Sequence, residues 1–148
     1  MIAPVFVDTN VLVYDRGERD PAKHERAREW MTALWRRPGL GVVGGQVLTE
    51  FYWTVTRKLK PGLADDQARS YVRTLGAWPI VPIDEAVIVE GWTVQDRYGF
   101  NFRDALVVAA ARTGGCRSLL TEDLQHGQDL DGLIVVSPFL QSPDSAFE

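Results

Sequence analysis

Short apolar runs alternate along this chain with longer segments in which apolar residues recur every three or four positions. The short runs are typical of strands and lie at residues 5–7, 40–43, 80–83, 118–121 and 133–136. The periodic segments are typical of helices and lie at residues 11–14, 21–37, 46–59, 64–75, 85–98 and 104–111. Polar residues do not alternate with apolar ones inside the strand runs, which is the pattern of strands covered on both faces. We therefore expect an α/β domain of three layers, with a short central parallel sheet between two layers of helices.

Local signals mark where several of these elements begin and end. Asp20-Pro21 is typical of a helix cap followed by proline in the first turn, and Asp84 is placed to cap the helix that ends at Gly99. Residues 125–132 are polar and predict a loop before the last strand. The globular domain is expected to cover residues 1–139, followed by a loosely ordered tail at residues 140–148.

Two acidic residues stand in unusually apolar surroundings. Asp8 is the only charged residue among the first fourteen, and it directly follows the apolar run at residues 5–7. Glu50 is the only charged residue between Arg37 and Arg57, although a solvated helix face would carry several charges. A carboxylate in a buried setting needs a partner, so both positions are candidates for function.

Four carboxylates are expected to meet at one edge of the sheet. Asp8 and Asp123 each follow a strand, Asp104 lies in the first turn of a helix, and Glu50 lies about one turn into another helix. Ligands of open parallel sheets bind beyond the carboxyl ends of the strands, which is where these positions converge. Each residue alone also has an ordinary explanation as a helix cap, a first-turn charge, a surface charge or a turn residue. Their joint occurrence favours a site.

A cluster of carboxylates predicts a bound cation. Like charges raise each other's pKa unless a cation lies among them, and oxygen ligands without histidine or thiolate select Mg²⁺ or Mn²⁺. Such a site suits hydrolysis of a phosphodiester, with one ion or two. Thr9, Asn10 and Thr121 are candidates to orient the carboxylates, or they bond locally in turns. Asp129 and Asp131 are expected to be solvated.

Composition narrows the class of protein. The 148 residues fit one domain, and no apolar run is long enough to span a membrane, so we expect a cytoplasmic protein. The single cysteine, Cys116, is expected to be a buried thiol. A net charge of −4 argues against tight unaided binding to nucleic acid, but less against a nuclease, because an acidic site lowers the net charge.

Four short motifs resemble, in order, the acidic motifs of the PIN-domain family, and in particular its VapC-type ribonuclease toxins of toxin–antitoxin pairs. They are VDTN at Val7 to Asn10, QVLTEF at Gln46 to Phe51, DALVVAAA at Asp104 to Ala111 and TED at Thr121 to Asp123. The similarity runs from about residue 4 to residue 139. Two positions depart from close relatives: Gly44 stands where a hydroxyl residue is common, and Arg103 stands where an apolar or aromatic residue is common.

The resemblance implies a Mg²⁺- or Mn²⁺-dependent endoribonuclease. It implies that Asp8, Glu50, Asp104 and Asp123 are both the metal ligands and the catalytic residues, and that Asn10 and Thr121 support them. It further implies an RNA substrate, a homodimer and an antitoxin that inhibits by covering the site. Arg103 is expected either to contact a substrate phosphate or to pair with Asp104.

Two other functions are weighed against this one. A phosphatase with Asp8 as covalent nucleophile would have a second aspartate two residues later, where this chain has Asn10. A module that binds nucleic acid or protein without cutting would lack some of the four acids.

Other residues have weaker assignments. The five tryptophans, at positions 30, 35, 53, 78 and 92, are better explained by core or interface packing than by stacking on bases. The basic residues that would hold an RNA backbone, or simply be solvated, are Arg16, Arg19, Lys23, Arg57 and Lys58.

Overall fold

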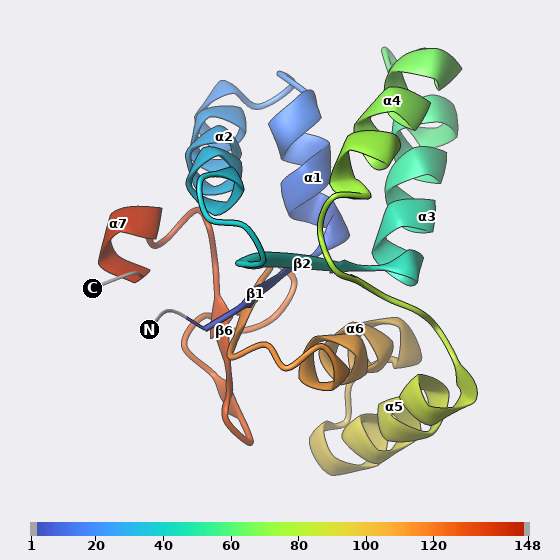
Figure 1. Cartoon of the computed structure of the whole chain (residues 1–148), viewed down its shortest axis with the longest axis vertical. Coiled ribbons are helices and arrows are strands. Elements are labelled where there is room, and N and C mark those ends of the chain that lie inside the picture. The colour runs from blue at the N-terminus through green and yellow to red at the C-terminus, as the bar shows by residue number, and fades with distance from the viewer. Residues whose placement is uncertain (1–2, 147–148) are drawn as a thin grey trace.

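A six-stranded sheet separates two layers of helices in the computed structural model of the chain, which describes residues 3–146 (Figure 1). The strands are β1 (Val5–Val7), β2 (Gly41–Gly44), β3 (Ile80–Val81), β4 (Ser118–Leu120), β5 (Asp129–Leu130) and β6 (Leu133–Val136). Their order is β3-β2-β1-β4-β6-β5, and every pair except β5–β6 is parallel. The predicted three-layer α/β fold with a central parallel sheet is confirmed.

Helices cover both faces of the sheet (Figure 1). On one face lie α1 (Thr9–Arg16), α2 (Pro21–Trp35), α3 (Gly45–Trp53) and α4 (Asp65–Leu75), and a π-helical segment, η1 (Thr54–Lys58), continues α3. On the other face lie α5 (Glu85–Tyr98) and α6 (Phe102–Thr113). A short α7 (Pro143–Ala146) lies beside α2. None of the helices in the described part of the chain is both long and apolar enough to cross a membrane.

The predicted caps are confirmed. The Asp20 carboxylate accepts a hydrogen bond from the Lys23 amide, and the Asp84 carboxylate accepts one from the Val87 amide. Gly99 ends α5 with a φ of 73°, in the left-handed region that glycine adopts without strain. Pro82 directly follows β3, the edge strand. Proline is tolerated at this position because it has no backbone N–H to donate to the sheet.

Three predicted elements are corrected. The first helix begins at Thr9, two residues early, because the Asp8 side chain accepts a hydrogen bond from the Thr9 amide and caps it. The helix expected from residue 64 begins at Asp65, and Ala64 precedes it as an exposed residue. The loop predicted at residues 125–132 contains β5, which forms an antiparallel hairpin with β6. The hairpin signal is Asp131-Gly132, both with positive φ, but β5 has only two residues and no pattern of its own.

The centre of the molecule is α6, as its apolar sequence predicts. All seven residues from Ala105 to Ala111 are buried, and so is the whole of β1. Cys116 is buried too, which confirms the expected buried thiol, and burial raises the pKa of this thiol to about 12. Trp30 and Trp78 pack in the core, whereas Trp35, Trp53 and Trp92 are exposed.

The buried carboxylate of Asp15 joins α1, α2 and α4, three helices on the same face of the sheet. The sequence pattern does not mark this residue. Asp15 of α1 is buried and accepts a hydrogen bond of 2.7 Å from the Tyr71 hydroxyl of α4. The Arg28 guanidinium of α2 lies 3.4 Å from the same carboxylate. Burial raises the pKa of Asp15, although the Tyr71 hydrogen bond and the Arg28 charge act against that rise.

The first residues of the predicted tail are attached to the domain. The Trp30 indole donates a hydrogen bond of 2.9 Å to the Gln141 carbonyl, and residues 143–146 form α7. Residues 147 and 148 lie outside the described residues. The domain boundary at residue 139 and the loose order of the tail stay predictions.

Gly41→Ala should destabilise the sheet. A Cβ at residue 41 would lie 2.6 Å from the Trp78 ring, which is buried and packs on Trp35. Overpacking of this kind lowers the free energy of unfolding by ~1–3 kcal/mol. Gly45→Ala is the matched control, because its Cβ would meet its nearest atom at 3.9 Å and should leave stability nearly unchanged. Equal urea midpoints for both variants and the wild type would contradict this packing.

Candidate active site

Asp8 lies at the carboxyl end of β1, in the middle of the sheet. Its amide donates to the Leu120 carbonyl, so the main chain continues the ladder to β4 for one more residue. Its side chain is almost fully buried, with 2% of its surface exposed. One carboxylate oxygen accepts from the Thr9 amide and the other from the Thr121 hydroxyl, at 2.7 and 2.8 Å. Asp8 is therefore a fixed carboxylate, held by the first residue of α1 and by the residue that follows β4.

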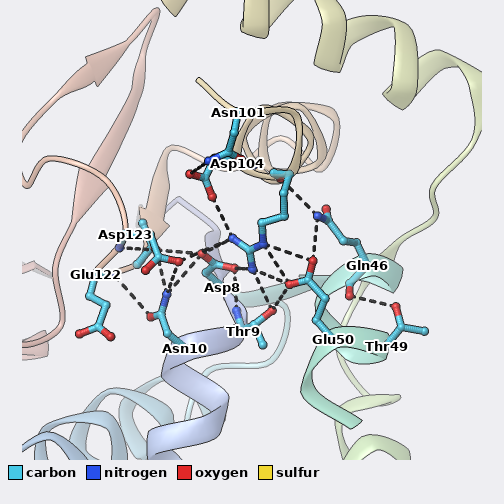
Figure 2. Close-up of polar contacts among 12 residues, drawn as sticks. Asp8, Thr9, Asn10, Gln46, Thr49, Glu50, Asn101, Asp104, Glu122 and Asp123 are labelled. Carbon is cyan, nitrogen blue, oxygen red and sulfur yellow. Dashed lines mark hydrogen bonds and ion pairs between the residues drawn. The ribbon is translucent and has the colours of Figure 1, made fainter. Parts of the chain in front are cut away.

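The other three predicted carboxylates converge on Asp8. Glu50 comes from α3, Asp104 from the first turn of α6, and Asp123 from the loop after β4. Figure 2 shows the four side chains turned toward a common centre from these separate elements. Their exposure rises outward: 16% of the Asp104 side chain, 32% of Glu50 and 45% of Asp123 are accessible. The structure thus brings together all four residues that the sequence singles out.

The centre of the cluster is filled by the guanidinium of Arg103. Its Nη2 lies 2.9 Å from Asp8 and also bonds Glu50, and its Nη1 lies 3.1 Å from Asp104. Asp123 is farther away, at 3.7 Å from Nη1. Of the two roles expected for Arg103, the pairing with Asp104 is present, and it is one of four contacts with carboxylates. The only signal of this arrangement along the chain is a basic residue directly before an acidic motif.

The electrostatics of the cluster follow from these contacts. Burial alone would lower the pKa of Arg103, but the hydrogen bonds with Glu50 and the charge of Asp8 outweigh burial and raise it, so the guanidinium stays charged. The pKa of Asp123 is raised, first by burial and next by the charge of Asp8, while Arg103 acts against this rise. The charge of Arg103 therefore does not cancel the effects of burial and of Asp8 on the pKa of Asp123.

Small polar side chains hold the carboxylates in place. Thr121 is fully buried, and its hydroxyl also accepts hydrogen bonds from the Asn10 amide group and the Asp123 backbone amide, both at 3.1 Å. Asn10 also donates to Asp123, at 3.3 Å. The Thr9 hydroxyl donates to Glu50 at 3.0 Å. These residues lie where the sequence places them as orienting groups.

Gln46 and Gly44 have structural roles in this region that the sequence motifs do not indicate. Gln46 lies one turn before Glu50, and its amide group donates to both the Glu50 carboxylate and the Arg103 carbonyl. It thereby joins α3 to α6, and its i,i+4 spacing to Glu50 was the available signal. Gly44 ends β2, and a Cβ there would lie 3.1 Å from the Phe6 ring, so a larger residue would crowd this ring.

Asp129 and Asp131 are not part of the cluster. Both are exposed on the β5–β6 hairpin. Asp129 accepts from the Gly132 amide at 2.7 Å, and Asp131 accepts from Arg97 and the Tyr98 hydroxyl. Their expected absence from the site agrees with these positions, although their carboxylates have partners and are not simply solvated.

A groove of about 410 Å³ adjoins the acidic cluster. Its walls include Asn10 and Asp123 of the cluster, the apolar side chains of Val13 and Leu59, and Arg19. Two other basic residues considered for RNA binding are engaged within the protein, Lys23 with Glu122 and Arg57 with Asp65. Arg19 is thus the basic residue, of those proposed from the sequence, that lines the groove.

The donor set fits a hard divalent ion in its chemistry, because carboxylate oxygens are the ligands that Mg²⁺ and Mn²⁺ prefer. The present side-chain arrangement does not hold one. Within residues 3–146, no three acidic, histidine or cysteine side chains form a group that could bind a metal ion as they stand. The guanidinium of Arg103 occupies the position between the carboxylates.

Comparison with known proteins identifies the family and the fold of this chain. Residues 5–128 match the sequence model of the PIN domain family. This segment is most of the chain and contains all four carboxylates. The chain belongs to the PIN domain family. No curated protein is similar enough in sequence to this PIN domain to serve as a relative.

Solved structures share the fold of this PIN domain at low sequence identity. A chain of a toxin–antitoxin complex from Klebsiella pneumoniae is 18% identical, with a TM-score of 0.63, over 90% of this chain and 97% of that one. A chain of FitAB bound to a DNA fragment is 17% identical, with a TM-score of 0.66, over 91% and 95%. VapC20 from Mycobacterium tuberculosis is 17% identical, with a TM-score of 0.60, over 78% and 86%.

Thr121→Val should weaken this PIN domain at its site. Valine keeps the shape of threonine but removes the hydroxyl that donates to Asp8 and accepts from Asn10. Leaving buried polar groups without a partner should lower the free energy of unfolding by ~1–3 kcal/mol, measured in urea. Thr121→Ser keeps the hydroxyl and should retain most of the stability. If the valine variant is as stable as the serine variant, the hydroxyl network is not structural.

Proposed function

We propose that this PIN domain is a metal-dependent endoribonuclease and the toxin of a toxin–antitoxin pair. The observation that carries the proposal is the convergence of Asp8, Glu50, Asp104 and Asp123 at the carboxyl edge of the sheet. Several carboxylates held this close are costly for folding unless they serve a cation. The names of the structural neighbours agree with the proposal: one is a toxin–antitoxin complex, and VapC20 is described as a toxin that cleaves the sarcin–ricin loop.

In this proposal the four carboxylates hold Mg²⁺ or Mn²⁺. The bound ion supplies positive charge to the phosphoryl oxygens and helps to ionise the attacking water. Asp8 is the inner, fixed ligand, because Thr9 and Thr121 lock its two oxygens. Asp123 is the most exposed of the four and lines the groove, so it would stand nearest to the entering substrate. The Asn10 side chain donates hydrogen bonds to both Thr121 and Asp123, and it thereby holds Asp123 in position relative to Thr121.

Single-stranded or looped RNA is the substrate that we infer. Val13 and Leu59 form an apolar wall of the groove beside the cluster, against which a base can pack. The Arg19 side chain of the same groove can bind a phosphate. The net charge of −4 disfavours broad binding to duplex backbones, so recognition is expected to be local.

The proposed antitoxin would cover the same carboxylates. A cluster that accepts a guanidinium from its own chain is complementary to arginine or lysine from a partner, which supports inhibition by insertion of a basic side chain. The homodimer and the cytoplasmic location belong to this proposal. The homodimer rests on the family resemblance, and the location rests on the composition of the chain. Exposed Val89 and Trp92, one turn apart on α5, are apolar surface that a dimer would bury.

Phosphatase chemistry through Asp8 has less support. The residue two positions later is an amide, Asn10, that cannot act as a general acid. A binding module without catalysis would have no reason to keep four converging carboxylates.

Asp8→Asn should abolish RNA cleavage. We expect purified protein to cut a panel of cellular RNAs into discrete products with Mg²⁺ or Mn²⁺ and not with EDTA. Removing the charge of the inner ligand should lower the cleavage rate by more than about 100-fold, a larger loss than is usual for an outer-sphere residue. Asp104→Asn should behave in the same way.

The control for this assay is Asp96→Asn, which alters an exposed aspartate of α5 outside the cluster and should cut normally. Thermal denaturation should show that every variant is folded. Cleavage by Asp8→Asn at the wild-type rate would refute the assignment of Asp8. RNA binding without metal-dependent cleavage by the folded wild type would favour the interaction module.

A further inference from the structure

Arg103 makes the contacts that a metal ion would make. Its Nε donates to both oxygens of Glu50, at 3.1 and 3.2 Å, and its two terminal nitrogens donate to both oxygens of Asp8, at 2.9 and 3.3 Å. Nη1 also donates to Asp104 at 3.1 Å. Nη2 has a further acceptor in the Thr9 hydroxyl, at 3.2 Å. All three nitrogens are thus committed to the acidic cluster.

The guanidinium and a divalent ion cannot share this space. Both would take the same oxygens of Asp8 and Glu50, and two cations side by side in a partly desolvated site repel each other strongly. An ion with two positive charges also neutralises the four carboxylates better than one guanidinium does. Binding of the ion therefore favours displacement of Arg103, and the cost of that displacement weakens the binding.

The position of Arg103 allows this displacement without a change of fold. The residue lies in the first turn of α6, and its side chain is 33% exposed at the mouth of the cluster. Its main chain is held separately, because the Gln46 side chain donates to the Arg103 carbonyl and Asn101 caps the helix. Rotation of the side chain alone would carry the guanidinium outward.

We propose that Arg103 is an exchangeable cation of the active site, which neutralises the carboxylates before metal binds and is displaced into the mouth when it binds. Because Arg103 directly precedes Asp104, the displaced guanidinium stays beside the bound ion, where it meets the phosphate of a substrate. The exchange rests on the metal site of the proposed function but not on RNA as the substrate. Arg103 then acts both as a barrier to metal and as a phosphate contact.

Binding of Mn²⁺ to Arg103→Gln tests the exchange. With the competing guanidinium removed, the full-length variant should bind Mn²⁺ at least about 10-fold more tightly than the wild type, because the metal-competent state no longer has to be populated first. The measurement is free Mn²⁺ by electron paramagnetic resonance, at fixed pH and ionic strength. Arg97→Gln is the matched control, since Arg97 pairs with Asp131 and Tyr98 away from the cluster, and it should bind as the wild type does.

A second measurement uses the wild-type chain, so the test survives if Arg103→Gln does not fold. In ¹⁵N-labelled protein, the Nε–Hε signal of Arg103, assigned through the variant or through its contact with Glu50, should be protected from solvent exchange without metal. Addition of Mg²⁺ should shift this signal and remove the protection, while the signal of Arg97 stays unchanged.

The outcomes separate the exchange from the proposed function. Equal Mn²⁺ affinities for the wild type and a folded Arg103→Gln, or an Arg103 signal that Mg²⁺ does not move although Mg²⁺ binds, would overturn the exchange and leave metal-dependent cleavage untouched. If neither protein binds Mn²⁺ at millimolar concentration, the metal site and the exchange both fail. Tighter Mn²⁺ binding by Arg103→Gln, together with an absence of metal-dependent RNA cleavage by the wild type, would support the exchange and refute the ribonuclease.

Discussion

The need to neutralise one buried carboxylate organises this molecule. Asp8 stands at the end of the central strand with almost none of its side chain exposed, and an isolated charge in that position would be too costly to keep. Arg103 lies against it, and Glu50, Asp104 and Asp123 gather around the same guanidinium. Removing one partner of a buried ion pair typically costs ~3–5 kcal/mol, so the site and the stability of the domain depend on each other.

The same interaction joins the two helical layers. Glu50 belongs to α3 on one face of the sheet, whereas Arg103 and Asp104 belong to α6 on the other, and Asp8 lies on the sheet between them (Figures 1 and 2). Gln46 adds a second link between α3 and α6, because its side chain donates a hydrogen bond to the Arg103 carbonyl. An open parallel sheet always leaves a crevice at its carboxyl edge, and here acidic side chains fill the crevice.

Much of this arrangement follows from the sequence. The apolar runs predict the order of strands and helices, and the parallel sheet then places Asp8, Asp104 and Asp123 at one edge without further information. Glu50 is predictable because no other charge lies near it in sequence. The hairpin at residues 129–136 was missed, since β5 is too short to show a pattern and only Asp131-Gly132 marks the turn.

The central contact of the site was only partly predictable. The proximity of Arg103 to Asp104 follows from their adjacency, but its reach to Asp8 and Glu50 depends on how α6 crosses the sheet, which no local pattern encodes. The same holds for Asp15 and Tyr71, which lie on helices far apart in sequence and meet only through tertiary packing. Sequence reasoning finds residues with unusual neighbours along the chain, but not partners that the fold brings together.

The most direct test of this account is the anomalous scattering of Mn²⁺ in a crystal of the wild-type protein. We expect a manganese peak between Asp8, Glu50 and Asp104, with the Arg103 guanidinium turned out to the mouth of the groove. A crystal soaked in Mn²⁺ that shows no peak there, with Arg103 still among the carboxylates, would contradict it.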